Sequence, residues 1–195
     1  MTVPIEVVTR DRLPAMAAVL ARAFADDPMI RWPLTAGDDL GERIERAFGS
    51  IYHGIVDLGL IWEAGDGDGF AVWIPAGMAD EMFESDAAAR DLVAPLTDDD
   101  AARYDVLWSW IETHTPDDVW YLDVLGVDPS KQGTGIGSAL IRFGLERAAS
   151  NGVDAFLETA VEANVAYYER FGFRTVFEGR ATGDAPRLWF MRTGG

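Results

Sequence analysis

The sequence predicts a single α+β domain in which strands of mixed direction build one sheet, and three observations support this. The chain has 195 residues, of which 49% are hydrophobic, so it is long enough to bury a sizeable core. Residues 118–173 show the pattern of strand, glycine-rich turn, helix, strand and short helix. Outside this segment the predicted elements do not alternate as a regular βαβ repeat, which favours α+β over a doubly wound fold.

The first 75 residues predict three short strands and two helices. Apolar residues at helical spacing mark the helices, and Asp26-Asp27-Pro28 ends the first of them. The glycine-rich segment before the third strand permits positive φ angles, so the second and third strands are expected to form a hairpin. In order, we expect a strand at Ile5–Val8, a helix over Leu13–Phe24, a loop at Met29–Pro33, a helix over about Asp38–Asp57, and strands at Leu60–Glu63 and Phe70–Pro75.

The rest of the chain predicts two acidic helices and then four further strands. The acidic helices lie between two strands of the predicted sheet, so they could cover an exposed site as a lid. Thr97 and the aspartates after it suit the start of the second one, where the helix dipole is positive. We expect helices at Asp80–Leu92 and Asp98–Glu112, and strands at Val119–Val127, Phe156–Thr159, Phe173–Glu178 and Arg187–Arg192.

Composition excludes several classes of function. The formal charge is −17 and no basic stripe is present, which disfavours DNA or RNA as a partner. An acidic surface serves either plain solubility or attraction of a cationic ligand. The chain has no cysteine and two histidines, so we expect no disulfide scaffold, no cysteine nucleophile and no metal site. Without an apolar run of about 18–20 residues or a secretory signal pattern, we expect a cytoplasmic protein with no membrane partner.

The glycine-rich turn Gln132–Gly137 follows a strand that Asp128-Pro129 ends. Small residues there leave backbone N–H groups and a helix N-terminus open to an anionic ligand, which predicts a phosphate cradle. One interpretation is a dinucleotide fingerprint, with Glu158 as the ribose-binding acid. However, Ser138 replaces the third glycine, and the turn lies two-thirds along the chain.

The second interpretation takes Gln132, Gly135 and Gly137 as a Q-x-x-G-x-G signature. With Phe156–Thr159, Asn164 and the segment YYERFGF that ends at Phe173, it resembles the acetyl-CoA-binding region of the GNAT superfamily of N-acyltransferases. Within that superfamily, LGVDPSKQGTGIGSAL and FLET are most similar to puromycin N-acetyltransferase-like members. The resemblance implies a mixed, largely antiparallel twisted sheet of about six or seven strands, flanked by helices and splayed between strands 4 and 5.

The resemblance also implies how acetyl-CoA would be bound. A bulge near Leu125-Gly126-Val127 would open the sheet for pantetheine, and glycine suits such a bulge or a close backbone approach. The N–H of Leu125 would meet the acetyl carbonyl, and backbone groups of Val127 would pair with pantetheine. Asn164 would bind the cofactor arm, or cap a helix. Residues expected at the phosphates are Lys131, Gln132, Gly133, Thr134, Gly135, Ile136, Gly137 and Ser138.

Tyr168 matches the tyrosine that serves as general acid towards the coenzyme A thiolate in the resembling family, so it is expected at the cofactor as well, and its alternative role is a core aromatic. Its neighbour Tyr167 is expected to point elsewhere, because adjacent helical residues do not share a face. Glu158 is the first candidate for the general base. Asp123, which is expected to share a strand face with Leu125 and Val127, is the second, and His114 is the third. Hydrogen bonds to the backbone or ion pairs are the alternative roles of the carboxylates.

The predicted function is acetyl transfer from acetyl-CoA to a primary amine of a small molecule, by direct attack in a ternary complex. An antibiotic or other xenobiotic amine is a candidate, a protein or peptide amine is an alternative, and a non-catalytic acyl-CoA sensor is another. Residues 1–117 would supply the acceptor site and the lid, and residues 118–195 the acetyl-CoA core, in a monomer or homodimer. The aromatic residues that could line the acceptor site, or pack in the core, are Trp32, Tyr52, Trp73, Trp108 and Trp110.

Overall fold

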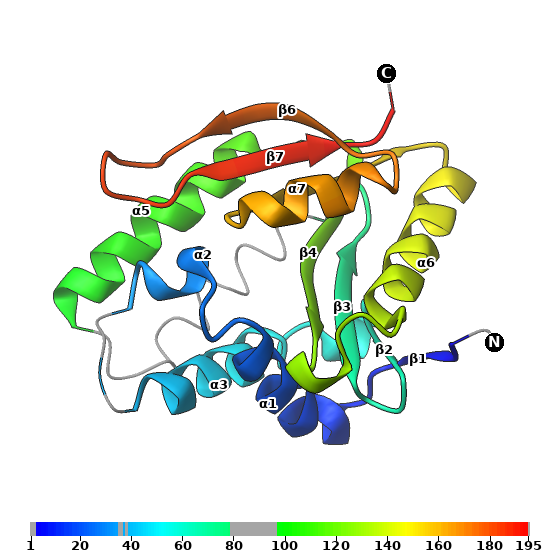
Figure 1. Cartoon of the computed structure of the whole chain (residues 1–195), viewed down its shortest axis with the longest axis horizontal. Coiled ribbons are helices and arrows are strands. Elements are labelled where there is room, and N and C mark those ends of the chain that lie inside the picture. The colour runs from blue at the N-terminus through cyan, green and yellow to red at the C-terminus, as the bar shows by residue number, and fades with distance from the viewer. Residues whose placement is uncertain (1–2, 35–36, 38, 79–96, 195) are drawn as a thin grey trace.

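The computed structural model describes residues 3–34, 37, 39–78 and 97–194 (Figure 1). These residues form a seven-stranded sheet in the order β1-β2-β3-β4-β5-β7-β6. Every neighbouring pair is antiparallel except β4 and β5, which confirms the predicted α+β fold with a mixed, largely antiparallel sheet. The strands are β1 Ile5–Val7, β2 Ile61–Ala64, β3 Gly69–Ile74, β4 Val119–Val127, β5 Asp154–Thr159, β6 Arg174–Gly179 and β7 Leu188–Arg192.

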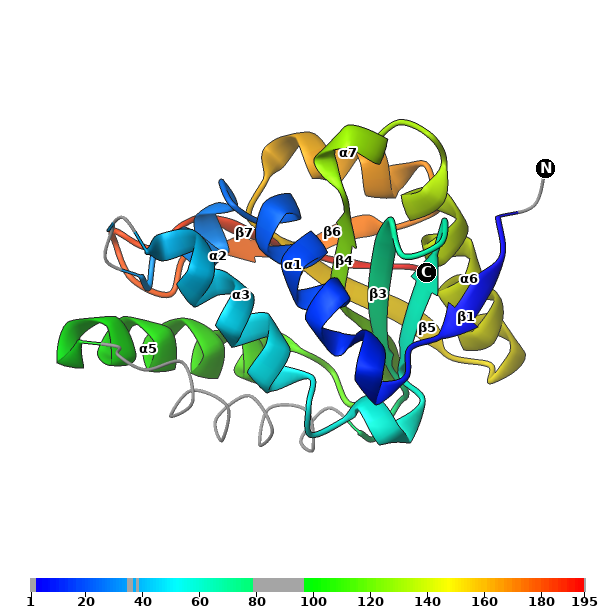
Figure 2. The same ribbon diagram turned by 90° about the horizontal axis from the view of Figure 1, so that it is seen from below.

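Helices α1 and α6 cover opposite faces of this sheet (Figure 2). All of β3 is buried, as expected for a strand that is covered on both faces. A Cβ atom on Gly126 of β4 would collide with Leu20 of α1, and one on Gly144 of α6 would collide with the Trp73 ring of β3. The helices are α1 Leu13–Ala23, α2 Pro28–Arg31, α3 Leu40–Ile51, α5 Asp98–His114, α6 Ile136–Ser150 and α7 Glu162–Glu169.

Two element predictions in the first half are wrong. Met29–Pro33 was expected to be a loop, but Pro28–Arg31 form a helical turn because the Asp27 side chain accepts a hydrogen bond from the Met29 N–H and proline suits the first helical position. Helix α3 ends at Ile51, whereas the apolar period predicted a helix to Asp57. The predicted helix Asp80–Leu92, and the lid that includes it, lie outside the described residues.

The start of α5 agrees with its sequence. The Thr97 hydroxyl accepts a hydrogen bond from the Asp100 N–H, and the Asp100 carboxylate accepts one from the Thr97 N–H, which makes a capping box. Arg43 of α3 donates to the same buried carboxylate at 3.0 Å. This ion pair joins α3 to the first turn of α5, and both helices reach the candidate site. In the described part of the chain, no helix is long and apolar enough to span a bilayer.

The sheet opens between β4 and β5, as predicted. The parallel pairing runs from Val119–Asp154 to Tyr121–Phe156 and stops there, although both strands continue. The pairing with β3 on the other side shifts at the same level, because Val72 pairs with Val124 and Trp73 with Leu122. Asp123 is therefore the bulged residue, two positions before the predicted Leu125–Val127. The bulge breaks the strand alternation at the place where the sheet opens.

Candidate active site

The glycine-rich turn leaves the N-terminus of α6 open. Gly133 and Gly135 have φ angles of 78° and 94°, and a Cβ atom at either would meet nothing within 4 Å, so backbone conformation rather than space selects glycine there. Gly135 is the N-cap of α6, and its lack of a side chain leaves the first N–H groups of the helix without a side-chain acceptor. This arrangement suits an anionic ligand.

A cleft of about 880 Å³ runs from this turn along the open edge of β4, and we call it the glycine-turn cleft. It collects every predicted cofactor residue except Thr134, whose hydroxyl donates to the Lys131 carbonyl at 2.6 Å and so stabilises the turn itself. The predicted residues that line it are Leu125, Gly126, Val127, Lys131, Gln132, Gly133, Gly135, Ile136, Gly137, Ser138, Asn164 and Tyr168.

Three cationic side chains are among the described residues that line the cleft, in a chain of net charge −17. Arg22 of α1 binds Asp128 at 2.7 Å, Lys131 binds Asp68 at 3.0 Å, and the Arg170 guanidinium lies 4.9 Å from the Tyr167 ring centroid. Hydrogen bonds from Ser130 and Arg22 lower the pKa of Asp128 to about 2, so this carboxylate stays ionised. Arg22 and Arg170 are absent from the sequence prediction. Arg22 reaches the cleft only because α1 crosses β4 at Gly126.

Asn164 is the third residue of α7, whose N-cap is Val161, so the helix-capping alternative for Asn164 is wrong. Its side-chain amide instead donates to the Thr159 hydroxyl at 3.4 Å from within the cleft. The expectation that Tyr167 points elsewhere is also wrong, because Tyr167 and Tyr168 both line the cleft. The Tyr167 hydroxyl lies 3.2 Å from the Ser138 hydroxyl and 3.2 Å from where a Cβ of Gly137 would be.

Tyr168 sits deeper in the same cleft. It is 8% exposed, and its hydroxyl makes no hydrogen bond within the described part of the chain. Burial raises the pKa of Tyr168, and the nearby Tyr167, Glu158 and Asp27 raise it further. The phenol therefore keeps its proton at neutral pH. The Tyr167 hydroxyl contacts the Ser138 hydroxyl beside the glycine turn. Tyr168 instead lies near the Glu158 carboxyl group, which contributes to its raised pKa.

Both predicted carboxylates line one small space of about 50 Å³, which we call the carboxylate cavity. The Tyr52 hydroxyl donates to Asp123 at 2.6 Å, and the Tyr121 hydroxyl donates to Glu158 at 2.9 Å. Because of the bulge, Asp123 lines this cavity together with Tyr121 and Val124, so the prediction that it shares a strand face with Leu125 and Val127 is wrong. Phe24 lines both this cavity and the glycine-turn cleft, so the two spaces adjoin.

The carboxyl groups of Asp123 and Glu158 line the cavity, and their burial by the surrounding protein changes their pKa values. Burial raises the pKa of Glu158 to about 8, and the nearby Asp123 adds to the rise, although the Tyr121 hydrogen bond lowers it. Burial also raises the pKa of Asp123, to about 6, against the lowering effect of Tyr52. The Oε2 atom of Glu158 is buried and has no hydrogen-bond partner among the described residues. A partly titrated carboxyl group with a free oxygen can accept a proton near neutral pH.

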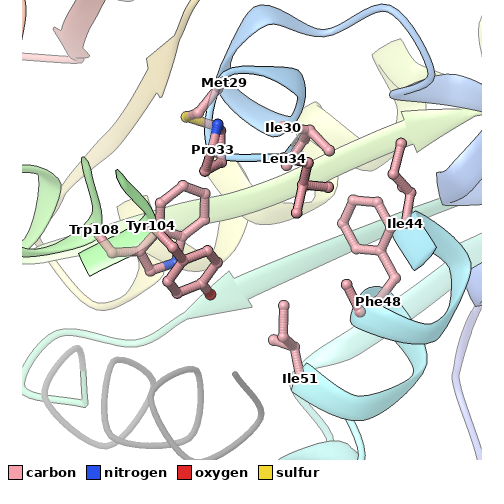
Figure 3. Close-up of a pocket in the computed structure, with 10 residues that line it drawn as sticks. Met29, Ile30, Pro33, Leu34, Ile44, Phe48, Ile51, Tyr104 and Trp108 are labelled. Carbon is pink, nitrogen blue, oxygen red and sulfur yellow. The ribbon is translucent and has the colours of Figure 1, made fainter. Parts of the chain in front are cut away.

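A second space, the apolar pocket, adjoins the carboxylate cavity (Figure 3). Figure 3 shows Tyr104 and Trp108 of α5 on one side of it, facing Phe48 and Ile51 of α3. The residues that line both spaces are Met29, Ile30, Phe48, Ile51 and Trp108. The two spaces therefore form a continuous region beyond the glycine-turn cleft.

The remaining predicted residues are divided between the site and the core. Tyr52 and Trp108 line the carboxylate cavity, and their role at the acceptor site stays a prediction. Trp73 does not, because it is completely buried under α6, where its indole N–H donates to the Leu140 carbonyl at 3.3 Å. Trp32, at the C-terminal end of α2, is not among the residues that line either space.

His114 and Trp110 lie together in an aromatic cluster rather than at the site. The His114 ring stacks on Phe177 with centroids 4.7 Å apart, and its Nδ1 atom lies 2.7 Å from the Trp110 carbonyl oxygen. Trp110 packs edge-on against Phe190 of β7. This packing removes His114 from the candidates for the general base.

Comparison with known proteins supports a common family. A sequence model of the Acetyltransferase (GNAT) family matches residues 70–173. The chain is 35% identical over 69 residues to mycothiol acetyltransferase from Streptomyces avermitilis, a match that covers 34% of this chain and 22% of that protein. This chain thus spans about a fifth of the length of the curated relatives that it matches.

Solved structures share the fold over the whole chain. A protein from Corynebacterium glutamicum, described as histone acetyltransferase HPA2 and related acetyltransferase, has a TM-score of 0.69 at 22% identity, with 99% of this chain and 96% of that chain covered. The PaiA N-acetyltransferase from Thermoplasma acidophilum, solved in complex with coenzyme A, has a TM-score of 0.60 at 11% identity and covers 100% of both chains. Since the family model matches more than half of the residues, the chain belongs to the GNAT family of acetyltransferases.

Proposed function

We propose that this protein transfers the acetyl group of acetyl-CoA to the primary amine of a small molecule. One observation carries the proposal: the glycine-turn cleft, with Tyr168 in it, adjoins the carboxylate cavity, where Glu158 and Asp123 have no cationic neighbour among the described lining residues. Acetyl-CoA binding is a property of the family, and a primary amine is the acceptor that two buried carboxyl groups suit best.

The glycine-turn cleft fits coenzyme A. Gly133 and Gly135 leave open space where any other residue would place a side chain, and the first turn of α6 presents N–H groups. We assign the pyrophosphate to the amides of Gln132–Gly137 and to Lys131, with Arg22 and Arg170 as further cations beside the phosphates. The stretch Leu125–Val127 pairs with β3 but not with β5, so its edge toward β5 offers backbone groups to the pantetheine amides.

Glu158 is the residue that would take the proton from the amine. A neutral amine nitrogen is needed for attack, and the carboxyl group that accepts its proton must be ionised beforehand. The pKa of Glu158, raised by burial to about 8, places half of the groups in that form near pH 8, and its Oε2 atom has room for a new hydrogen bond. Asp123 lies in the same cavity and would hold the amine or its water in place.

Tyr168 would supply the proton that the leaving sulfur needs. When bound, acetyl-CoA supplies a thioester carbon that an amine can attack directly, with coenzyme A leaving as its thiol. Burial raises the pKa of the Tyr168 phenol, so it is protonated throughout the neutral range and has no competing hydrogen bond within the described residues. Tyr167 lies nearer the glycine turn through Ser138, and we assign it to cofactor binding.

A thiol-release assay with acetyl-CoA and a panel of amines tests the function, with thermal shift as a second readout. We expect stabilisation by coenzyme A and turnover with at least one small primary amine. Puromycin belongs in the panel, because the resemblance to puromycin N-acetyltransferase-like members makes an antibiotic a candidate acceptor. Stabilisation without turnover on any amine would contradict the proposal and favour an acyl-CoA sensor. Turnover only on peptide N-termini would assign a protein acceptor instead.

A further inference from the structure

The apolar pocket has no part in the acetyl-transfer chemistry described above. The ten described residues that line it carry no charge, and they come from α2 and the residues after it, from α3, and from α5 (Figure 3). The Tyr104 and Trp108 rings stack with centroids 4.8 Å apart and form one wall. A pocket of this kind loses little by excluding water and gains from an apolar occupant.

The pocket continues into the carboxylate cavity through Ile30, Ile51 and Trp108, which line both spaces. Among the described residues that line the two spaces, the only charged groups are Asp123 and Glu158, both at the end nearer β4 and β5. A ligand that fills both spaces therefore meets acidic groups at one end and hydrocarbon at the other.

We propose that the acceptor is a primary amine with one basic nitrogen and an uncharged apolar body about the size of one six-membered ring, held with its nitrogen in the carboxylate cavity and its body in the apolar pocket. This proposal rests on the proposed acetyl transfer and names the substrate class for it. Phenethylamine is the probe that represents the class, and its aromatic ring would lie beside Trp108 and Phe48.

The volumes set the size of the body. The apolar pocket measures about 40 Å³ and the carboxylate cavity about 50 Å³, as space open to the centre of a water molecule. A single water needs about 10–15 Å³ of such space and takes up about 30 Å³ of liquid, so the apolar pocket holds roughly three waters or about 100 Å³ of ligand. A single ring or a short alkyl chain fits that space.

The charges exclude two other classes of amine. A diamine such as putrescine would place its second ammonium among the described lining residues of the apolar pocket, none of which carries a negative charge, and desolvating a cation there is costly. An amino acid such as phenylalanine would bring its carboxylate next to Asp123 and Glu158, and like charges in a partly buried site repel.

The first test compares kcat/KM for a set of amines at fixed, saturating acetyl-CoA. We expect phenethylamine to exceed ethylamine by at least about tenfold, because each added methylene that the pocket buries is worth roughly fourfold. Putrescine and phenylalanine should fall about 100-fold below phenethylamine. Equal or better turnover of putrescine or phenylalanine would overturn the acceptor proposal while leaving acetyl transfer intact, whereas absence of turnover on every amine would overturn the proposed function itself.

Variants at Ala47, which lines the apolar pocket on α3, make the test specific. Ala47→Asp should lower kcat/KM for phenethylamine and raise it for putrescine, so that the ratio of the two moves by at least about tenfold toward the diamine. Ala47→Leu, which fills the pocket without adding charge, should lower the ratio of kcat/KM for phenethylamine to that for ethylamine about tenfold. The Leu variant keeps the proposal testable if the Asp variant does not fold.

Glu45→Gln is the matched control, since Glu45 is an exposed residue of the same helix that lines neither space. We expect it to keep the wild-type ratios. If both Ala47 variants also keep these ratios, the apolar pocket does not hold the acceptor and the proposal is overturned.

Discussion

The Tyr121 hydroxyl donates a 2.9 Å hydrogen bond to Oε1 of Glu158, while Oε2 of the same carboxyl group is buried without a partner in the described residues. The hydrogen bond from Tyr121 replaces only part of the hydration that an ionised carboxylate loses on burial. Glu158 therefore prefers its neutral form in the unliganded protein. The same imbalance that would make Glu158 a proton acceptor near neutral pH also makes it a source of instability.

Glu158→Gln should therefore stabilise the unliganded protein in a pH-dependent way. The folded-state pKa of about 8 lies above the unfolded value of 4.5, so between these values the folded state binds more protons and stability falls as pH rises. The variant should gain about 4 kcal/mol over wild type at pH 8 and less than about 0.5 kcal/mol at pH 4.5. Urea unfolding at both pH values measures this. Glu146→Gln, the same change at an exposed site on α6, should show no such pH dependence.

The pH dependence of kcat/KM distinguishes the two candidate bases. If Glu158 accepts the proton, the rate should rise with pH about tenfold per unit and level off near pH 8, and this inflection should disappear in Glu158→Gln. The profile is measured with two amines of different basicity. An inflection that stays at the same pH belongs to the protein, and one that moves with the amine belongs to the amine. An inflection near pH 6 that Asp123→Asn removes would assign the base to Asp123 instead.

Gly135→Ala should weaken acetyl-CoA binding, because its φ of 94° is unfavourable for any residue with a Cβ atom and the turn would rearrange. Gly152→Ala is the matched control, since Gly152 has a φ of 69° and open space around its Cβ position but lies at the other end of α6. Both variants should lose about 1 kcal/mol of stability. By calorimetry, only Gly135→Ala should lose affinity for acetyl-CoA, and an equal loss in Gly152→Ala would refute the cradle.

The sequence predicted the local features well, because glycine turns and strand ends depend on neighbouring residues. The turn at Gln132–Gly137 and the break after Asp128-Pro129 are of this kind. Two features that depend on contacts between distant elements were missed. Arg22 reaches the cleft because α1 crosses Gly126, and the bulge turns Asp123 toward Tyr52.

The sequence also does not separate the aromatic residues of the site from those of the core. Trp73 and Trp108 were both expected to line the acceptor site or to pack in the core, yet one is enclosed by α6 and the other lines the carboxylate cavity. Periodicity indicates that a side chain is buried, but it does not indicate whether protein or a ligand will cover it. Met29–Pro33 was missed for another reason, because one turn of helix capped by Asp27 is too short to show a period.

The most direct measurement is mass-spectrometric detection of N-acetyl-phenethylamine after incubation of the protein with acetyl-CoA and phenethylamine, with Tyr168→Phe and Tyr167→Phe in parallel. The wild type should form the product with one coenzyme A thiol released per molecule. Tyr168→Phe should form it about 100-fold more slowly at unchanged acetyl-CoA affinity, because it lacks the proton for the leaving sulfur, whereas Tyr167→Phe should keep most of the rate. A wild-type rate in Tyr168→Phe, or no acetylated amine from the wild type, would contradict the account.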